Sequence, residues 1–298
     1  MITSQEHNLE SLTWSIKTRA YVQLLKPRLS MLVAFSCAFG YGLATRGSVD
    51  WVILTVLTLS GFLLSGASVT INQVIEKDLD ALMERTKMRP LPTHRLGVSE
   101  ALIFAGLCTM TSLFLLWKFT NPLTVVLSLI SMVLYCFVYT PLKRVGPIAV
   151  FVGAFPGALP PLLGWIAATG AVTHEAMIIF GIQFIWQFPH FWAIAWVADD
   201  DYRKAGFKLL PSGGGKDLNT AIQIMIYTMF LIPLGLLPAT FGMTGLNSAI
   251  VATVCGVAFF AQTLSLMKTG SRQSALRIMF GSFLYLPIVQ IAFLVDKL

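Results

Sequence analysis

The chain has 298 residues, of which 56% are hydrophobic and 12% charged, with a mean hydropathy of +0.74 and a formal net charge of +7. A soluble domain carries about 25% charged residues, so this composition excludes a soluble enzyme and makes lipid the solvent for most of the surface. The positive charges lie in short segments between apolar runs, which points to membrane topology rather than to nucleic-acid binding.

The first 28 residues form a polar segment that we place in the cytoplasm. This segment is too polar for a signal peptide. Within it, Leu9, Leu12, Ile16 and Ala20 recur at helical spacing. Two interpretations of residues 9–25 are equally open: an amphipathic helix lying on the membrane surface, or a frayed tail.

Nine apolar runs follow, each long enough to cross about 30 Å of hydrocarbon at about 1.5 Å per residue. Because the runs are continuous and not alternating, they predict helices and exclude a β-barrel. The predicted fold is therefore an all-α polytopic bundle of nine transmembrane helices, with residues 29–298 as a single membrane domain. The predicted spans are 29–47, 51–75, 98–117, 121–140, 147–169, 174–198, 218–241, 244–267 and 277–295.

The distribution of Lys and Arg predicts the orientation of these spans. With a cytoplasmic N-terminus, 18 of the 21 cations lie inside, and only Arg46, Lys118 and Lys297 lie outside. A bias of this size follows the positive-inside rule. We therefore expect a bacterial inner-membrane protein whose C-terminus faces the periplasm.

Two of the predicted cytoplasmic loops resemble each other, which indicates a weak internal repeat. Each loop runs from acidic to basic residues and ends in Leu-Pro, at Leu91-Pro92 and at Leu210-Pro211, an offset of 119 residues. The offset spans four predicted helices. The domain is therefore predicted to consist of two repeats of four helices, followed by a ninth helix.

Acidic side chains gather where two of these spans end. Asn72, Glu76 and Asp80 are spaced by four residues and share one helical stripe. Carboxylates at a helix C-terminus are unfavourable, so we expect a compensating cation. Hard oxygen ligands suit Mg²⁺ or another divalent cation such as Ca²⁺. We predict a metal site that also uses the second acidic cluster, at Asp199 and Asp200. The alternative is that both clusters are solvated charges at a membrane boundary.

Cationic side chains surround the acids on the same predicted face. A divalent ion together with guanidinium and ammonium groups would neutralise a diphosphate as its C–O bond breaks. Positive-inside topology alone is the alternative explanation for these cations, most of all for Lys87 and Arg89. The candidate diphosphate-binding cations are Arg28, Lys77, Arg85, Lys143 and Arg144.

The predicted span 174–198 carries polar groups at membrane depth. Gln183, Gln187 and His190 lie on one helical face, with Trp186 and Pro189 between them. Polar groups inside a membrane are costly and tend to face a cavity. His190 is a candidate ligand of a metal or of a macrocycle iron, or a base. A buried histidine that only donates a structural hydrogen bond is the alternative.

The motif Asn72-x-x-x-Glu76-x-x-x-Asp80 resembles the first acidic motif of the UbiA-type intramembrane prenyltransferases, with Glu76 where that family usually has Asp. Tyr139 and Lys143 resemble the family's Y-x-x-x-K element. Further stretches resemble the protoheme IX farnesyltransferase (heme O synthase) family within that superfamily. These stretches are Lys26-Pro27-Arg28, Gly157-Ala158-x-Pro160-Pro161, Trp186-Gln187-x-Pro189-His190-Phe191 and Asp200-Asp201-Tyr202.

The resemblance implies transfer of a farnesyl group from farnesyl diphosphate to a vinyl group of heme b, with water added, giving heme O. It assigns Asn72, Glu76, Asp80, Lys143 and His190 as catalytic residues. It also implies that Tyr139 helps to bind the diphosphate, and that Trp186, Gln187 and His190 bind heme. A downstream heme-modifying enzyme is a further candidate partner. A prenyltransferase with an aromatic, quinone-precursor acceptor and a secondary transporter are the two alternatives.

Overall fold

The computed structural model describes residues 16–213 and 215–298, and the regular secondary structure of these ranges is helical apart from one isolated bridge between Thr244 and Lys297. Eight segments of the described chain are long and apolar enough to cross a membrane. They are α3 (Trp51–Ile75), α5 (Val98–Phe119), the combined span Pro122–Leu142, α8 (Ile148–Thr169), α9 (His174–Val197), α11 (Leu218–Thr240), α12 (Leu246–Thr269) and α13 (Arg272–Val295).

The ninth predicted span corresponds to α2 (Pro27–Ala44), which follows the helix Ile16–Leu24 after a 45° bend. Counting this bent pair as one span gives nine. The predicted all-α membrane bundle is thus confirmed in class and in the order of its spans. The combined span is not uniform, since it consists of α6 (Pro122–Val133), the π-helical segment η1 (Leu134–Tyr139) and α7 (Thr140–Leu142).

The described part of the N-terminal segment is a helix that packs on the protein. Ala20 and Leu24 are buried against Leu91 and Leu96, while Ile16 is exposed. Leu9 and Leu12 lie outside the described residues, so the surface-helix interpretation of residues 9–25 stays a prediction.

Polar side chains fix where the long helices begin. Asp50 accepts hydrogen bonds from the backbone N–H groups of Val52 and Ile53 at 2.8 and 3.1 Å, which caps α3. Such caps satisfy N–H groups that have no partner within the helix. Asn121, Thr173, Asp217 and Ser271 cap α6, α9, α11 and α13 in the same way.

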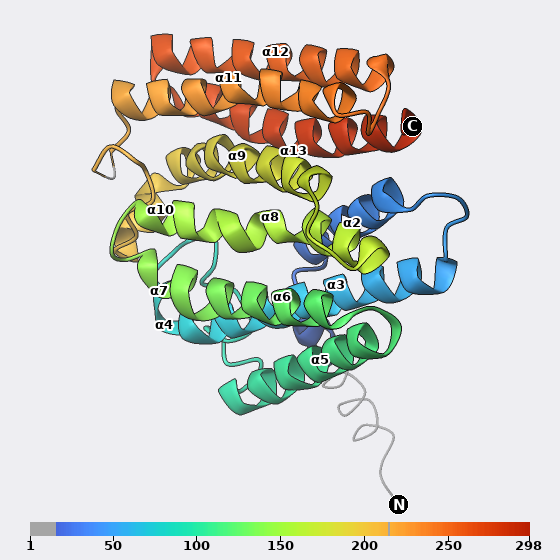
Figure 1. Cartoon of the computed structure of the whole chain (residues 1–298). Coiled ribbons are helices and arrows are strands. Elements are labelled where there is room, and N and C mark those ends of the chain that lie inside the picture. Colours follow the sequence, from blue (N-terminus) through green and yellow to red (C-terminus); the bar gives the residue numbers. More distant parts are fainter. Residues whose placement is uncertain (1–15, 214) are drawn as a thin grey trace, which may run out of the picture.

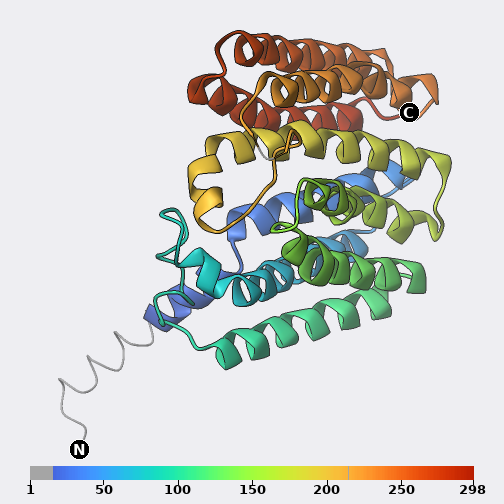
Figure 2. The same cartoon turned by 90° about the vertical axis from the view of Figure 1, so that its left-hand side faces the viewer.

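The long helices run side by side, from α5 at one edge of the bundle to α12 at the other (Figures 1 and 2). Glycines allow two central helices, α2 and α8, to approach closely. A Cβ on Gly40 would lie 1.9 Å from the carbonyl oxygen of Pro161, and one on Gly164 would lie 2.0 Å from that of Cys37. Small residues that bring backbones together are typical of helix pairs in membranes.

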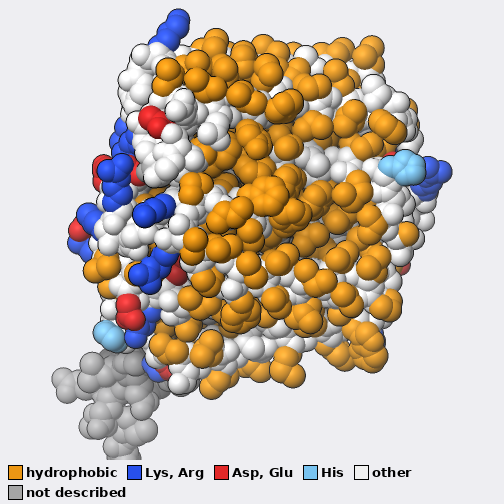
Figure 3. All heavy atoms as spheres, turned by 60° about the vertical axis from the view of Figure 1, so that its left-hand side comes forward, with side chains coloured by type: hydrophobic (Ala, Val, Ile, Leu, Met, Phe, Trp, Pro, Cys, Tyr) orange, Lys and Arg blue, Asp and Glu red, His pale blue; other side chains and the backbone are white. Residues whose placement is uncertain are grey.

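Short helices and loops gather at one end of the bundle. These are α4 (Lys77–Asp80), α7 and α10 (Asp199–Lys204), all at the left of Figure 1. Figure 3 shows charged side chains concentrated along this end, beside a broad hydrophobic wall. The fold therefore brings loops from distant parts of the sequence to one charged end of an apolar bundle.

Candidate active site

One cavity of about 410 Å³ opens among α2, α3, the combined span, α8, α9 and α13. Its lining extends along α3 from Leu57, past the end of that helix at Glu76, to Asp80 in α4. At the charged end the lining includes carboxylates and cations. Farther in it includes α9 side chains, among them Gln187 and His190. A single cavity thus contains two chemically different regions.

The carboxylate stripe continues across the break between α3 and α4. The helix α3 ends at Ile75, but the Asp80 N–H still donates to the Glu76 carbonyl at 2.7 Å. The four-residue spacing is therefore kept across the break, and Asn72, Glu76 and Asp80 all line the cavity. All three side chains are buried.

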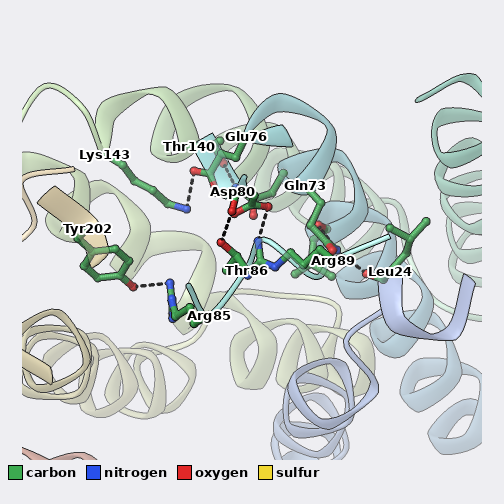
Figure 4. Close-up of polar contacts among 12 residues, drawn as sticks. Leu24, Gln73, Glu76, Asp80, Arg85, Thr86, Arg89, Thr140, Lys143 and Tyr202 are labelled. Atoms are coloured by element: carbon green, nitrogen blue, oxygen red, sulfur yellow. Dashed lines mark hydrogen bonds and ion pairs between the residues drawn. The ribbon is translucent and has the colours of Figure 1, made fainter. Parts of the chain in front are cut away.

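The π-helical segment places partners opposite this stripe. The Thr140 hydroxyl donates to the carbonyl of Tyr135, five residues back, at 2.9 Å, and it accepts from Asn72 Nδ2 at 3.0 Å. The Asn72 amide nitrogen is therefore engaged and its Oδ1 is left as an acceptor. Three residues beyond Thr140, Lys143 Nζ lies 2.8 Å from Glu76 Oε1. Figure 4 shows the contact between Lys143 and Glu76 at the charged end. Single π-helical turns within α-helices occur frequently at functional sites.

Asp80 has one oxygen paired and one free. Its Oδ2 lies 2.5 Å from Arg89 Nη1, while its Oδ1 is buried without a hydrogen-bond partner in the described structure. Burial raises the pKa of the Asp80 carboxyl, and the Arg89 guanidinium lowers it in part. Buried carboxylate oxygens normally have partners, so the free Oδ1 indicates a missing ligand.

The donor set around this oxygen fits a divalent cation. Asp80 Oδ1, Asn72 Oδ1 and the carboxylate of Glu76 are hard oxygen ligands of the kind that Mg²⁺ and Ca²⁺ take. Among residues 16–213 and 215–298, no three His, Cys, Asp or Glu side chains are grouped to hold a metal. The fit therefore depends on the amide of Asn72 and on oxygens that a diphosphate would bring.

The second acidic cluster does not reach the cavity. Asp199 pairs with Arg203 at 3.0 Å and with Lys216 at 3.5 Å, and Asp200 projects outward with its carboxylate 3.4 Å from Lys216. These local cations satisfy both carboxylates, and neither residue belongs to the lining. The predicted metal set is thus divided, with Asn72, Glu76 and Asp80 at the cavity and the other two outside it.

Asp201, the third acid of that cluster, joins the loop after α3 to the loop after α9. Its carboxylate accepts from the backbone N–H groups of Glu84 and Arg85, both at 3.3 Å. Arg85 Nη2 donates to the Tyr202 hydroxyl at 2.9 Å, and its guanidinium also lies over the Tyr202 ring (Figure 4). These contacts hold Arg85 and Tyr202 in the cavity wall.

The cations that line the cavity differ from the predicted set. Arg85 and Lys143 are there as predicted, together with Arg89 and Lys26. Arg28, Lys77 and Arg144 are not in the lining: Arg28 and Arg144 are exposed, and Lys77 lies 3.8 Å from the exposed Asp78.

Lys26 replaces Arg28 because of the backbone bend. Lys26 has φ 45 and ψ 64, a left-handed conformation that only a few non-glycine residues adopt, and it separates the helix Ile16–Leu24 from α2. Burial, followed by repulsion from Arg89 and Lys143, lowers the pKa of Lys26 to about 7. A nearby anion would raise this pKa and favour the protonated ammonium.

The α9 side of the cavity holds His190 in a fixed orientation. The Ser282 hydroxyl donates to the Met279 carbonyl at 2.6 Å, so it accepts from His190 Nδ1 at 2.8 Å. Nδ1 is then the protonated nitrogen and Nε2 carries the lone pair. The imidazole stacks on the Trp186 ring at 4.4 Å between centroids, and Trp186 Nε1 donates to the Ser282 carbonyl. The ring is thus oriented as a candidate iron ligand.

A proline in α8 leaves a backbone carbonyl free for a polar contact with α9. Pro161 has no N–H to donate to the carbonyl of Gly157, and that carbonyl accepts from Gln183 Nε2 at 2.8 Å instead. Gln183 Oε1 in turn accepts from Gln290 Nε2 at 2.9 Å. The polar stripe predicted on α9 is therefore partly satisfied by α8 and α13.

Comparison with known proteins places this arrangement in a family. A model of the UbiA prenyltransferase family matches residues 33–286. The chain belongs to this family. It is 53% identical over 280 residues to a protein named protoheme IX farnesyltransferase from Cytophaga hutchinsonii, covering 94% of this chain and 98% of that protein. It is 44% identical over 282 residues to a protein of the same name from Christiangramia forsetii, covering 93% of each.

Solved structures of the UbiA family share the fold. A structure of digeranylgeranylglyceryl phosphate synthase has a TM-score of 0.77 at 18% identity, covering 94% of this chain and 98% of that one. A UbiA homologue from Archaeoglobus fulgidus, bound to GPP and Mg²⁺, has a TM-score of 0.66 at 17% identity, with 92% and 99% covered. At these identities the likeness establishes the UbiA fold.

Within this UbiA fold, the structure collects most of the predicted site residues on one cavity. Tyr139, Trp186, Gln187 and His190 line it along with the carboxylate stripe and Lys143. Sequence reasoning did not assign Lys26, Arg89 or Tyr202 to the site. The signal for Lys26 was its place before Pro27, a residue that ends one helix and begins the next.

Proposed function

We propose that this UbiA family member transfers a farnesyl group from farnesyl diphosphate to a vinyl group of heme b, with addition of water, giving heme O. The observation that carries the proposal is one cavity with two regions, a carboxylate and cation end for a diphosphate and a histidine-bearing aromatic side for a macrocycle. The names of the relatives at 53% and 44% identity support this choice of substrates.

The charged end would bind the diphosphate. A divalent cation held by Asn72, Glu76 and Asp80 would neutralise the leaving group as the C–O bond breaks, and Mg²⁺ is present with GPP in the Archaeoglobus fulgidus homologue. Lys26, Arg85, Arg89 and Lys143 line the same end and would contact the remaining phosphate oxygens. The ion pairs with Lys143 and Arg89 hold the carboxylates of Glu76 and Asp80 in place.

The walls between the two regions would protect the farnesyl cation. Tyr135 and Tyr139 lie 5.4 Å apart, centroid to centroid, and Phe191 lies 6.3 Å from Tyr139. All three rings line the cavity. Aromatic faces attract cations, and an apolar wall excludes the water that would otherwise hydrolyse an allylic cation.

The α9 region would bind heme. His190 Nε2 has the lone pair that an axial ligand of iron needs, and Trp186 offers an aromatic surface alongside. An aromatic, quinone-precursor acceptor would leave this oriented histidine without a role. Because the chain belongs to a prenyltransferase family, a prenyltransferase is favoured over a secondary transporter.

The protein is a multi-pass membrane protein with its charged site at one end of the bundle. We propose that this end faces the cytoplasm of a bacterial inner membrane, since the Lys and Arg residues of the inside loops lie there. Docking of a downstream heme-modifying enzyme stays a prediction.

The test is product analysis with the purified protein. Heme b, farnesyl diphosphate and Mg²⁺ should yield a pigment with the mass of heme O, and omission of either substrate should abolish it. Asp80→Asn serves as the control with strongly reduced turnover. Farnesylation of a quinone precursor, with heme b recovered unchanged, would overturn the choice of acceptor.

A further inference from the structure

The side-chain amide of Gln187 has no hydrogen-bond partner among the described residues. It lines the cavity from α9, one helical turn before His190, and only 5% of Gln187 is exposed. Its neighbours are already satisfied, because the Gly157 carbonyl accepts from Gln183 and Gln183 accepts from Gln290. Gln187 is therefore the one amide of this stripe with unused donors and an unused acceptor.

Packing, not hydrogen bonding, holds this amide in place. A Cβ on Gly157 would come within 2.5 Å of Gln187 Nε2 and 2.8 Å of Oε1, so the amide lies directly against the α8 backbone. Burying an amide without hydrogen-bond partners is unfavourable. A position that is packed so closely and yet left unpaired indicates a small polar ligand that fills the missing hydrogen bonds.

The proposed reaction, on which this inference rests, needs such a ligand. The first cation forms when the C–O bond of farnesyl diphosphate breaks, and it must meet no water. The second cation forms when the vinyl π electrons bond to C1 of the farnesyl group, which leaves the positive charge on the vinyl carbon attached to the porphyrin. This second cation must meet water if the product is to carry a hydroxyl.

We infer that Gln187 is a positioning residue that holds the water which captures this second cation. The oxygen lone pair of that water forms the new C–O bond at the vinyl carbon attached to the porphyrin. The proton released from this oxygen ends on the diphosphate leaving group, so charge and atoms balance. Without a held water, the cation would lose a proton from the neighbouring carbon and give an alkene.

Gln187→Leu tests the inference through the identity of the product. It removes the amide at similar volume, and we expect the hydroxylated share of the farnesylated heme to fall at least tenfold. The replacement product should be lighter by the mass of one water. Gln187→Glu keeps an acceptor at the same reach and should restore much of the hydroxylated product. In ¹⁸O-labelled water, the wild-type hydroxyl should carry the label.

The matched control is Gln262→Leu, which removes another membrane-depth amide. Gln262 lies on α12 outside the cavity lining, and its Oε1 also has no partner in the described structure. This variant should leave the product ratio unchanged. A change equal to that of Gln187→Leu would overturn the inference, because it would show a general effect of amide loss.

Two further results would overturn it. One is an unchanged hydroxylated share in Gln187→Leu. The other is a combination of two observations: Gln187→Leu no longer binds heme, and Gln187→Asn, whose amide is one methylene shorter, keeps the wild-type product ratio. Gln187 would then be only a heme contact. Failure of the wild type to farnesylate heme at all would instead refute the proposed function.

Discussion

Lys143 Nζ lies 2.8 Å from Glu76 Oε1, and the two residues are buried at the ends of helices 67 residues apart in the sequence. The pair joins the acidic stripe of α3 to the residues that follow the π-helical segment. Two buried charges stabilise a fold only when both are present, because either one alone keeps its full desolvation penalty.

The first prediction follows from this pairing. Glu76→Gln leaves the Lys143 ammonium buried without a partner and should cost about 3–5 kcal/mol of stability. The double variant Glu76→Gln, Lys143→Met should regain most of that loss but remain inactive. Thermal unfolding in detergent measures both. A comparison is Lys17→Met, which breaks an exposed 2.8 Å pair with Glu100 and should cost about 0–1 kcal/mol. A double variant no more stable than Glu76→Gln would refute the coupling.

The second prediction concerns the unpaired oxygen of Asp80. Asp80→Asn keeps the size and removes the charge, so kcat/KM should fall about 30- to 1,000-fold, or about 2–4 kcal/mol. Chelation of divalent ions should stop turnover. Glu76→Asp, which shortens the side chain by one methylene and keeps the charge, should retain substantial activity.

Asp78→Asn is the matched control for this experiment. It makes the same chemical change two residues away on α4, at a side chain that is 94% exposed. Steady-state assays should show wild-type turnover. Equal loss in both variants would point to the overall charge of the loop and not to a metal site.

Local patterns in the sequence were sufficient to predict the membrane bundle and the acidic stripe. Continuous apolar runs specify spans, and a spacing of four residues specifies one helical face, so Asn72, Glu76 and Asp80 could be grouped from their spacing alone. The same logic grouped Gln183, Gln187 and His190 on α9. Both depend on contacts within one helix.

What could not be predicted depends on contacts between elements. Asp199 looked equivalent to Asp80, but its cations lie on its own helix and on the following loop, at Arg203 and Lys216. Lys26 enters the cavity only because its backbone takes a left-handed turn before Pro27. The π-helical segment likewise shifts Thr140 and Lys143 by a fraction of a turn, and no spacing rule anticipates that shift.

The third prediction is the orientation of the bundle. A reporter that is active only in the periplasm should be active when fused after Leu298 and inactive when fused after Arg89. The reason is the 18-to-3 distribution of Lys and Arg. The reverse pattern of reporter activity would place the charged end of the cavity in the periplasm and refute the proposed topology.

The fourth prediction is a pH dependence of diphosphate binding. Below about pH 7 Lys26 is protonated in both the free and the bound protein, so it adds no pH dependence. Above about pH 7 the free protein has lost that proton and must regain it on binding. Farnesyl diphosphate affinity should therefore fall with rising pH, by up to about tenfold per pH unit. Equilibrium titrations between pH 7 and 9 measure the slope.

Lys26→Arg should abolish that slope, because a guanidinium stays protonated throughout this range. Lys77→Arg makes the same change outside the cavity lining and should leave the slope in place. If the wild type shows no slope, Lys26 does not contact the diphosphate.

The last prediction separates the two substrates. Asp80 lies at the charged end of the cavity and His190 on its α9 side, so each variant should lose one ligand and keep the other. Asp80→Ala should lose farnesyl diphosphate affinity and still bind heme. His190→Ala should keep farnesyl diphosphate, while heme affinity falls about 30- to 1,000-fold and the heme absorption spectrum shifts. His174→Ala, at the exposed first residue of the same helix, should behave as wild type. Titration of each purified variant with each substrate decides the assignment, and unchanged heme affinity, spectrum and turnover in His190→Ala would reduce His190 to a structural partner of Ser282.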